Sequence, residues 1–466
     1  MAGSLGLVVS DRDFVGPWSL YRVSGFDDVF KVFSAVNEGE PVVFVFDGVW
    51  GRVGDLLRVA RSRGLNELYF DFVDAGVEEG LLGGVVGLDA LVYARLLRLR
   101  FSDASRAPVR LSLGKVVSRR DLLRAGPVAA LEYLVRPVVD EGPCSSLRGC
   151  TMCVNVCPEK ALSGKPPIVD YDKCTLCGLC FSICPVEAIH SPQLTPKAVE
   201  AFIAAIRESL REPVNIVIAE YGALQDIAGG LAGYKVKPTV ALPVWSLAEV
   251  TPLVLLKLAY HGFTPVIYAK GGGGLKDPIV ELEMLGVVRV ARSVGELKAR
   301  LSEEPLFKVG EVDVTARGYV LRVLGEVVER ATLSFPGVGY LEVDENLCTL
   351  CGACARVCPT NALTLHEGDT VKLVLRLSEC TGCRECETSC PEKAIRVKWA
   401  YERGALERKL AESRIARCVK CGAPLGPEAL IVAVERRLGI TGDVSGRHTR
   451  LCSNCKALSI IEDLVR

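Results

Sequence analysis

The chain has 466 residues, of which 49% are hydrophobic, and its 56 Lys and Arg residues balance its 56 Asp and Glu residues. This length predicts about three or four domains, and the neutral charge gives no overall field that would attract nucleic acid or an anionic membrane. The most apolar stretch, residues 244–269, is interrupted by Glu249, Lys257 and His261, so we expect no membrane span. The first residues do not form a basic and apolar leader, and we expect a cytoplasmic protein.

Residues 1–117 are predicted to form a small α/β unit. Residues 42–46 and 68–73 have the composition of buried strands, and the spacing of apolar residues between them predicts an amphipathic helix over 53–63. A helical connector follows at 118–140, with its helix expected over 118–136. A serine at its start and an aspartate three residues later form a capping box, which favours this interpretation.

All 20 cysteines fall into groups of four, and none is left over. Four groups have the short spacing of iron–sulfur ligands, and the last cysteine of each is followed by proline. These groups are Cys144, Cys150, Cys153, Cys157; Cys174, Cys177, Cys180, Cys184; Cys348, Cys351, Cys354, Cys358; and Cys380, Cys383, Cys386, Cys390. A disulfide framework would not need this spacing, whereas a [4Fe–4S] cube needs one thiolate for each iron.

The spacing also predicts how the cysteines are shared between clusters. The first three cysteines of a group wrap one cube, and the fourth ligates the other cube of the pair. Cys184 would then complete the cluster of Cys144, Cys150 and Cys153, and Cys157 that of Cys174, Cys177 and Cys180. Cys390 would complete the cluster of Cys348, Cys351 and Cys354, and Cys358 that of Cys380, Cys383 and Cys386. The first group departs from the pattern, because five residues separate Cys144 from Cys150. Whether Cys144 is a ligand therefore depends on how this longer loop folds. Two dicluster modules are therefore expected, at residues 141–192 and 343–400.

Residues 193–342 are predicted to form a second α/β domain. Strands are expected at 215–219, 238–242, 265–269 and 287–290, and helices at 196–211, 247–261, 276–285 and 294–302. This alternation is typical of a parallel sheet with right-handed crossovers. The run Gly271–Gly274 could cradle a phosphate, with Lys276 as the nearest cation, but it lacks the Lys-Ser/Thr ending of a P-loop. A flexible loop is the favoured interpretation.

Residues 401–466 contain the fifth cysteine group, which consists of two short pairs. The pairs are Cys418 with Cys421 and Cys452 with Cys455, and this pattern predicts a tetrahedral Cys₄ zinc ribbon. A rubredoxin-like iron is the alternative, because iron and zinc share this geometry. A helix is expected near 427–438. His448 is not needed as a ligand, because four thiolates already complete the site.

The segment 396–451 is locally basic, with 12 Lys and Arg against 6 Asp and Glu. This excess favours nucleic acid, but only Trp399 and Tyr401 could serve as stacking platforms there. A solvated or protein-docking face is therefore preferred, and no nucleic acid is expected as a partner. The four histidines of the chain form no recognisable pair, so no catalytic residue is predicted.

Several segments resemble known families. The cysteine groups resemble those of bacterial two-cluster ferredoxins. Residues 42–101, with the sequence GLNELYF at their centre, are similar to part of the A-type subunit of heterodisulfide reductase, but that family's flavin-binding glycine fingerprint is not found. We therefore expect no flavin.

Residues 213–291 resemble the delta subunit of methyl-viologen-reducing hydrogenase, which links hydrogenases to heterodisulfide reductases. The resemblance is carried by the sequences VNIVIA at 214–219, PVWS at 243–246 and GFTPVIYA at 262–269. That family holds a small iron–sulfur centre here, whereas this chain has no cysteine between Cys184 and Cys348. The resemblance thus implies a docking or spacer domain.

Together these patterns predict an α+β multidomain protein. Two ferredoxin-like dicluster modules flank a parallel α/β domain, with an N-terminal α/β unit before them and a C-terminal zinc ribbon after them. The predicted function is that of a polyferredoxin with four [4Fe–4S] clusters and one zinc, which relays single electrons to redox protein partners. It would be a subunit of a heterodisulfide-reductase-like or hydrogenase-linked complex in a reducing, anaerobic cell. The alternative is a structural iron–sulfur and zinc protein that binds nucleic acid or acts as an assembly scaffold.

Overall fold

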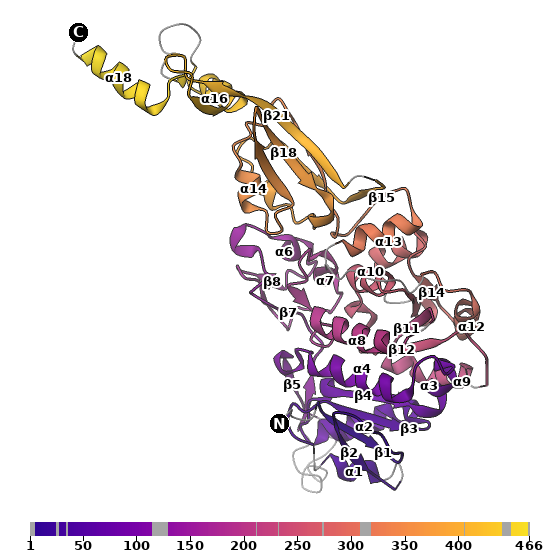
Figure 1. Ribbon diagram of the computed structural model, residues 1–466. Helices are drawn as coiled ribbons and strands as arrows, with labels where there is room; N and C mark the ends of the chain where they lie inside the picture. The colour runs from indigo at the N-terminus through magenta and orange to yellow at the C-terminus, as the bar shows by residue number, and fades with distance from the viewer. Residues whose placement is uncertain are drawn as a thin grey trace. The chain divides into compact units, whose positions relative to one another are not determined.

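The computed structural model describes residues 5–24, 28–33, 36–113, 129–210, 212–231, 233–272, 275–307, 318–404, 406–439 and 449–464. The chain folds into two compact units (Figure 1). Unit 1 comprises Met1–Cys144, Thr151–Thr315 and Arg322–Val327, and unit 2 comprises Ser145–Cys150, Ala316–Leu321 and Val328–Arg466. Helix α13 (Tyr319–Val327) is divided between them.

The first sheet of unit 1 is parallel, with the strand order β2-β1-β3-β4. Its strands are β1 (Leu7–Ser10), β2 (Ser19–Arg22), β3 (Val42–Phe46) and β4 (Phe70–Asp74). Its helices are α1 (Val29–Val32), α2 (Val53–Ser62), α3 (Ala75–Leu82) and α4 (Leu88–Arg100). The predicted helix 53–63 and the strand at 42–46 are confirmed. The second predicted strand begins later, because a short 3₁₀ turn occupies Glu67–Tyr69.

The second sheet of unit 1 is also parallel, with the order β12-β11-β13-β14. Its strands are β11 (Val214–Glu220), β12 (Thr239–Val244), β13 (Phe263–Tyr268) and β14 (Arg289–Ala291). Its helices are α8 (Pro196–Ser209), α9 (Leu224–Leu231), α10 (Pro252–Tyr260), α11 (Asp277–Met284) and α12 (Val294–Ser302). The predicted parallel alternation is confirmed, and helix α12 has the predicted bounds.

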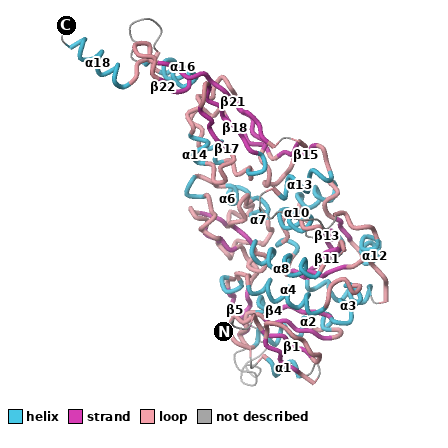
Figure 2. The backbone as a smooth tube through the Cα atoms, in the orientation of Figure 1, coloured by secondary structure: helices cyan, strands magenta, loops and turns pink. Residues whose placement is uncertain are grey.

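The two sheets of unit 1 contribute to one continuous apolar core. Most of helix α4 is buried, including Leu91, Arg95 and Leu99, and the helix lies beside α8 (Figures 1 and 2). Arg95 and Arg98 of α4 are almost fully buried and pair with Asp71 of β4. The same guanidinium groups donate to main-chain oxygens of β12, so α4 links the two sheets through charged side chains as well as apolar ones.

The connector before the first dicluster module differs from the prediction. Residues 114–128, which include most of the predicted helix, lie outside the described residues. The prediction is wrong for the remainder, because Ala129–Tyr133 forms strand β6 and pairs antiparallel with β5 (Val109–Leu113). The helix-forming composition of this segment is overridden by backbone hydrogen bonds to a partner strand, which local propensity does not encode.

Short strands frame the first module. Strand β7 (Val138–Val139) pairs with β10 (Ile189–His190), and β8 (Leu162–Ser163) pairs with β9 (Ile168–Val169). The two chain segments that enter and leave the module are thereby held together. The module's small core is built from cysteines and apolar residues such as Phe181 and Ile189.

Unit 2 is mostly antiparallel. Its four-stranded sheet has the order β17-β18-β21-β22, with β17 (Leu363–Glu367), β18 (Thr370–Arg376), β21 (Glu407–Arg417) and β22 (Pro424–Pro427). Two further pairs join β15 (Arg330–Thr332) to β20 (Ala400–Glu402) and β16 (Tyr340–Val343) to β19 (Ile395–Lys398). Strand β21 pairs with β18, so one sheet includes residues on both sides of position 400.

The C-terminal part of unit 2 carries two helices, α16 (Glu428–Arg437) and α18 (Ser453–Leu464). Helix α16 agrees with the helix expected near 427–438. Among the described residues of both units, no helix combines the length and the apolar character that a membrane crossing requires.

Candidate metal centres

Each of the four predicted cluster loops places its third cysteine on a short helix. The helices are α6 (Met152–Val156), α7 (Leu179–Ile183), α14 (Ala353–Val357) and α15 (Glu385–Thr388). The residue before the second cysteine has positive φ in every loop: Gly149 (105°), Leu176 (54°), Leu350 (55°) and Gly382 (69°). The longer first loop therefore reaches Cys150 through the same left-handed turn as the others, although it contains three more residues.

The fourth cysteine of each loop begins a second repeated turn, with the sequence Cys-Pro-x-x-Ala. The residue before the alanine has positive φ in all four turns: Lys160 (50°), Glu187 (51°), Asn361 (53°) and Lys393 (52°). This left-handed residue turns the next N–H back toward the cysteine. The N–H groups of Ala161, Ala188 and Ala394 donate to the Sγ atoms of their cysteines at 3.3, 3.2 and 3.3 Å. In the remaining turn, Cys358 Sγ lies 3.7 Å from Thr360 Oγ1.

Sequence reasoning missed this turn, although its signal is visible in the four repeats of Cys-Pro-x-x-Ala. Its chemical role is clear from the geometry. An N–H group directed at sulfur stabilises a thiolate, and hydrogen bonds to ligand sulfurs are one of the means by which a protein sets a cluster potential.

In unit 2 the cysteines of the two loops lie close to one another. Burial raises the pKa of Cys354 to about 11, and the neighbouring thiols of Cys348, Cys351 and Cys390 contribute to the increase. Burial likewise raises the pKa of Cys380 to about 12, with Cys383 and Cys358 among its neighbours. Cys390 therefore lies near Cys348 and Cys354 of the other loop. Cys358 in turn lies near Cys380, Cys383 and Cys386.

Two further contacts shape the surroundings of Cys380. An N–H of Gly339 lowers the pKa of Cys380, and a Cβ added at Gly339 would lie 2.5 Å from Cys380 Sγ. The glycine therefore keeps the space beside the sulfur open. Trp399 Nε1 donates to the Gly382 oxygen at 2.9 Å and fixes the loop from its other side.

In unit 1 the second group is assembled in the same way. Cys174, Cys177, Cys180 and Cys157 line one cavity, together with Leu176 and Gly178. Burial raises the pKa of Cys174, and the thiols of Cys177 and Cys157 contribute to the increase. The donor set and the cavity fit a group that binds four thiolates.

The first group is less completely defined. Cys144, Cys153 and Cys184 belong to one small apolar cluster of unit 1. Cys150 ends the segment Ser145–Cys150, which is grouped with unit 2. Ligation of one cluster by all four cysteines therefore stays a prediction.

A buried lysine from the second α/β domain lies against the second cluster loop, and sequence reasoning did not find this role. The sequence indicates Lys276 as the cation nearest to a phosphate at the glycine run. Its Nζ instead lies within hydrogen-bonding distance of the Gly178 oxygen, at 3.2 Å, and of Ser182 Oγ, at 3.3 Å. Gly273 and Gly274 lie outside the described residues.

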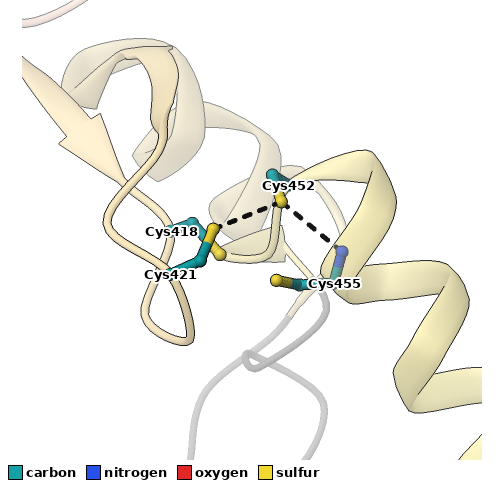
Figure 3. A group of neighbouring side chains, drawn as sticks. All are labelled: Cys418, Cys421, Cys452 and Cys455. Carbon is teal, nitrogen blue, oxygen red and sulfur yellow. Dashed lines mark hydrogen bonds between the residues drawn. The ribbon is translucent and has the colours of Figure 1, made fainter.

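The fifth group is brought together in unit 2 (Figure 3). The Sγ atoms of Cys418, Cys421, Cys452 and Cys455 all lie within 4.8 Å of one another. The Sγ atoms of Cys421 and Cys452 are 3.6 Å apart. A tetrahedral zinc with Zn–S bonds of ~2.3 Å places its sulfurs about 3.8 Å apart, so the spacing fits a single metal ion.

Local structure explains this arrangement. Strand β21 delivers Cys418, and a tight turn with Gly422 at φ 72° returns the chain so that the Cys418 N–H donates to the Ala423 oxygen at 2.7 Å. Helix α18 begins at Ser453 and presents Cys455 to the same point. Main-chain N–H groups, that of Cys452 first, lower the pKa of Cys418 to about 6, which favours the thiolate form that metals bind. His448 lies outside the described residues.

Two family models match the cysteine-rich segments. A 4Fe-4S dicluster domain matches residues 347–394, which contain all eight cysteines of the second module. A 4Fe-4S binding domain matches residues 167–190, which contain the four cysteines from Cys174 to Cys184. The chain thus contains two ferredoxin-type 4Fe-4S domains.

Individual relatives are similar over the same kind of segment. The chain is 31% identical over 80 residues to the polyferredoxin protein MvhB of Methanothermus fervidus, which is 17% of this chain and 18% of that protein. It is 32% identical over 77 residues to a ferredoxin of Alicyclobacillus acidocaldarius subsp. acidocaldarius, covering 16% of this chain and 97% of the relative. It is 39% identical over 54 residues to pyruvate synthase subunit PorD of Methanothermobacter marburgensis, covering 12% of this chain and 62% of that relative.

Proposed function

Because the chain belongs to the 4Fe-4S ferredoxins, we propose that it is a polyferredoxin that relays single electrons through four [4Fe–4S] clusters. The observation that carries this proposal is the exchange of fourth cysteines between paired loops. Cys157 lines the cavity of the second loop, and Cys390 lies beside Cys348 and Cys354. Such an exchange is the ligand pattern of two-cluster ferredoxins.

A cluster bound by these thiolates supplies a one-electron couple. The protein's own residues supply the environment of that couple. The alanine N–H groups donate to the ligand sulfurs and stabilise their negative charge. Buried residues such as Phe181 and Ile189 exclude water from the first module, and Leu341 and Ile395 do the same in the second. No proton donor or nucleophile is needed for this reaction.

We further infer that the chain is a subunit of a larger redox complex of the heterodisulfide-reductase-like or hydrogenase-linked type. The similarity to a protein named polyferredoxin and to a pyruvate synthase subunit supports this inference. A second α/β domain between the modules would then provide a surface for redox protein partners. A reducing, cytoplasmic compartment suits thiolate-bound clusters.

The fifth cysteine group is proposed to bind one structural zinc. The donor set of four thiolates closes the coordination sphere of the metal, which leaves no position for a substrate. A rubredoxin-like iron is the alternative at this site, since its geometry would be the same.

Metal analysis and reductive titration of protein purified without oxygen test the proposal. We expect about 16 irons and one zinc per chain, and reversible reduction of the clusters by dithionite followed by EPR spectroscopy. A matched variant with Cys348 and Cys351 replaced by serine should lose the iron of one cluster. About eight irons with zinc in the modules, or clusters that cannot be reduced, would contradict the proposal and favour a structural scaffold.

A further inference from the structure

Lys276 is a buried cation that directs its ammonium group at a cluster loop. Its side chain is 7% exposed, and it precedes helix α11 in the second α/β domain. Its Nζ lies 2.6 Å from the Ala248 oxygen and 3.2 Å from the Val250 oxygen, both in its own domain. The remaining contacts are to the Gly178 oxygen and the Ser182 hydroxyl, next to Cys177 and near Cys180 in the first module.

The loop is shaped to receive this lysine. Gly178 has φ +71°, a conformation that favours glycine. A Cβ added there would lie 2.5 Å from Lys276 Nζ and 2.1 Å from the Ala248 oxygen. Any other residue at this position would therefore displace the ammonium group or the turn at Ala248, which follows strand β12. The absence of a side chain at Gly178 and the position of Lys276 depend on each other.

The charge of Lys276 is not neutralised by a carboxylate in contact with it. All four oxygens around Nζ are main-chain or hydroxyl oxygens, and no carboxylate of the described residues forms an ion pair with it. By contrast, Lys257 is also buried but lies 3.1 Å from Glu200 and 3.4 Å from Glu187. Burial lowers the pKa of Lys276 to about 8, and the negative groups that oppose this effect are Cys180, Cys177 and Glu249.

A buried ammonium without a contacting counter-ion is costly unless an anion is close. Gly178, whose oxygen lies 3.2 Å from Nζ, also lines the cavity that Cys157, Cys174, Cys177 and Cys180 share. The geometry thus places Lys276 beside the group that these thiolates would bind, and a cube held by four thiolates carries net negative charge. Phe181, whose ring centroid is 6.0 Å from Nζ, keeps the surroundings apolar and so weakens the screening of this attraction.

We propose that Lys276 raises the reduction potential of the cluster at Cys157, Cys174, Cys177 and Cys180, and that the second α/β domain thereby sets the driving force of electron transfer through this cluster. The inference rests on the proposed function. In the step concerned, one electron from a one-electron donor enters the cluster site, no bond is formed or broken, and the proton stays on Nζ. The fixed ammonium group stabilises the added negative charge, so it stabilises the reduced form more than the oxidised form.

The size of the effect follows from Coulomb's law. At a separation on the order of 10 Å and an effective dielectric constant of ~20, one positive charge changes the reduced-to-oxidised ratio by about tenfold. For a one-electron couple, a tenfold ratio corresponds to ~59 mV.

The test compares Lys276→Met and Lys276→Gln with Lys276→Arg in the full chain, by potentiometric titration with EPR detection. Both neutral variants should lower the midpoint potential of one cluster by ~59 mV, which corresponds to a tenfold change in its reduced-to-oxidised ratio. The midpoint potentials of the other clusters should stay fixed and serve as internal references. The arginine variant should retain most of the wild-type potential, because it keeps the charge. Lys257→Met, which removes a lysine already paired with carboxylates, should shift that midpoint much less.

Unchanged midpoints in the neutral variants, with all clusters intact, would overturn the inference while leaving the proposed function in place. An equal shift of every midpoint would also overturn it, because the effect would then not be local. Loss of one cluster in both neutral variants would also overturn the inference, because Lys276 would then be a structural residue that the cluster needs for assembly. Failure of the wild-type protein to form reducible clusters would instead contradict the proposed function itself.

Discussion

Replacing Arg98 by methionine should destabilise unit 1 strongly. Arg98 is 1% exposed, and its Nη2 lies 2.6 Å from a carboxylate oxygen of Asp71 on β4. Its Nη1 donates to the Pro243 oxygen on β12 at 3.1 Å, so one guanidinium group joins the two sheets. Methionine keeps much of the apolar volume but leaves Asp71 with fewer donors and one main-chain oxygen without its partner.

The expected cost follows from these contacts. Removing one partner of a buried ion pair costs about 3–5 kcal/mol, because the other charge stays buried. Arg95 remains 3.0 Å from Asp71, and the Tyr221 hydroxyl also donates to it at 3.0 Å, which favours the lower end of that range. The lost hydrogen bond to Pro243 adds about 1 kcal/mol. We therefore expect Arg98→Met to lower the free energy of unfolding of unit 1 by about 4 kcal/mol.

Hydrogen exchange measured on peptides that cover β4 and β12 is the appropriate assay, since a multidomain metalloprotein does not unfold in one step. Arg12→Met is the matched control. Arg12 also pairs with a carboxylate, that of Asp47, at 2.8 Å, but the side chains are 35% and 66% exposed, so we expect a loss below about 1 kcal/mol. A change below about 1 kcal/mol for Arg98→Met would refute the reasoning, because the network would then not hold the sheets together.

Three further outcomes are expected. Replacing Cys390 by serine should damage the cluster wrapped by Cys348, Cys351 and Cys354, and Cys358→Ser should damage the other; EPR spectra in which each variant loses only its own loop's cluster would contradict the exchange. Serine at both Cys418 and Cys421 should increase proteolysis within 401–466 while the reduction of the clusters is unchanged, and a red protein with a reversible ferric couple at this site would instead indicate iron. Burial raises the pKa of Glu78 from 4.5 to about 8, so the folded state holds a proton that the unfolded state releases. Its contribution to stability is present below pH 4.5 and is lost as the pH rises through about 8. Glu78→Gln should flatten this pH dependence of stability, measured by hydrogen exchange of the peptides that cover α3 and corrected for the intrinsic pH dependence of exchange. An unchanged slope would show that Glu78 is ionised in the folded state.

Features that depend on short stretches of chain could be predicted from the sequence alone. Cysteine spacing identified the ferredoxin-type modules, because three ligands of a cluster lie within one tight loop. The alternation of apolar runs placed β11 to β14 and α12, because burial imposes a period on each element separately. The repeated Cys-Pro-x-x-Ala turn was also present in the sequence, but its meaning depends on a positive φ that composition does not reveal.

Features that join distant residues could be known only from the folded chain. Ala129–Tyr133 became a strand because Val109–Leu113 pairs with it, and β21 joined the sheet of β18 although the cysteine pattern suggested a boundary near residue 400. Lys276 meets Gly178 across 98 positions of sequence, and Arg98 meets Pro243 across 145. Such contacts depend on which faces pack together in the folded chain, and the local periodicity of either segment carries no information about its partner.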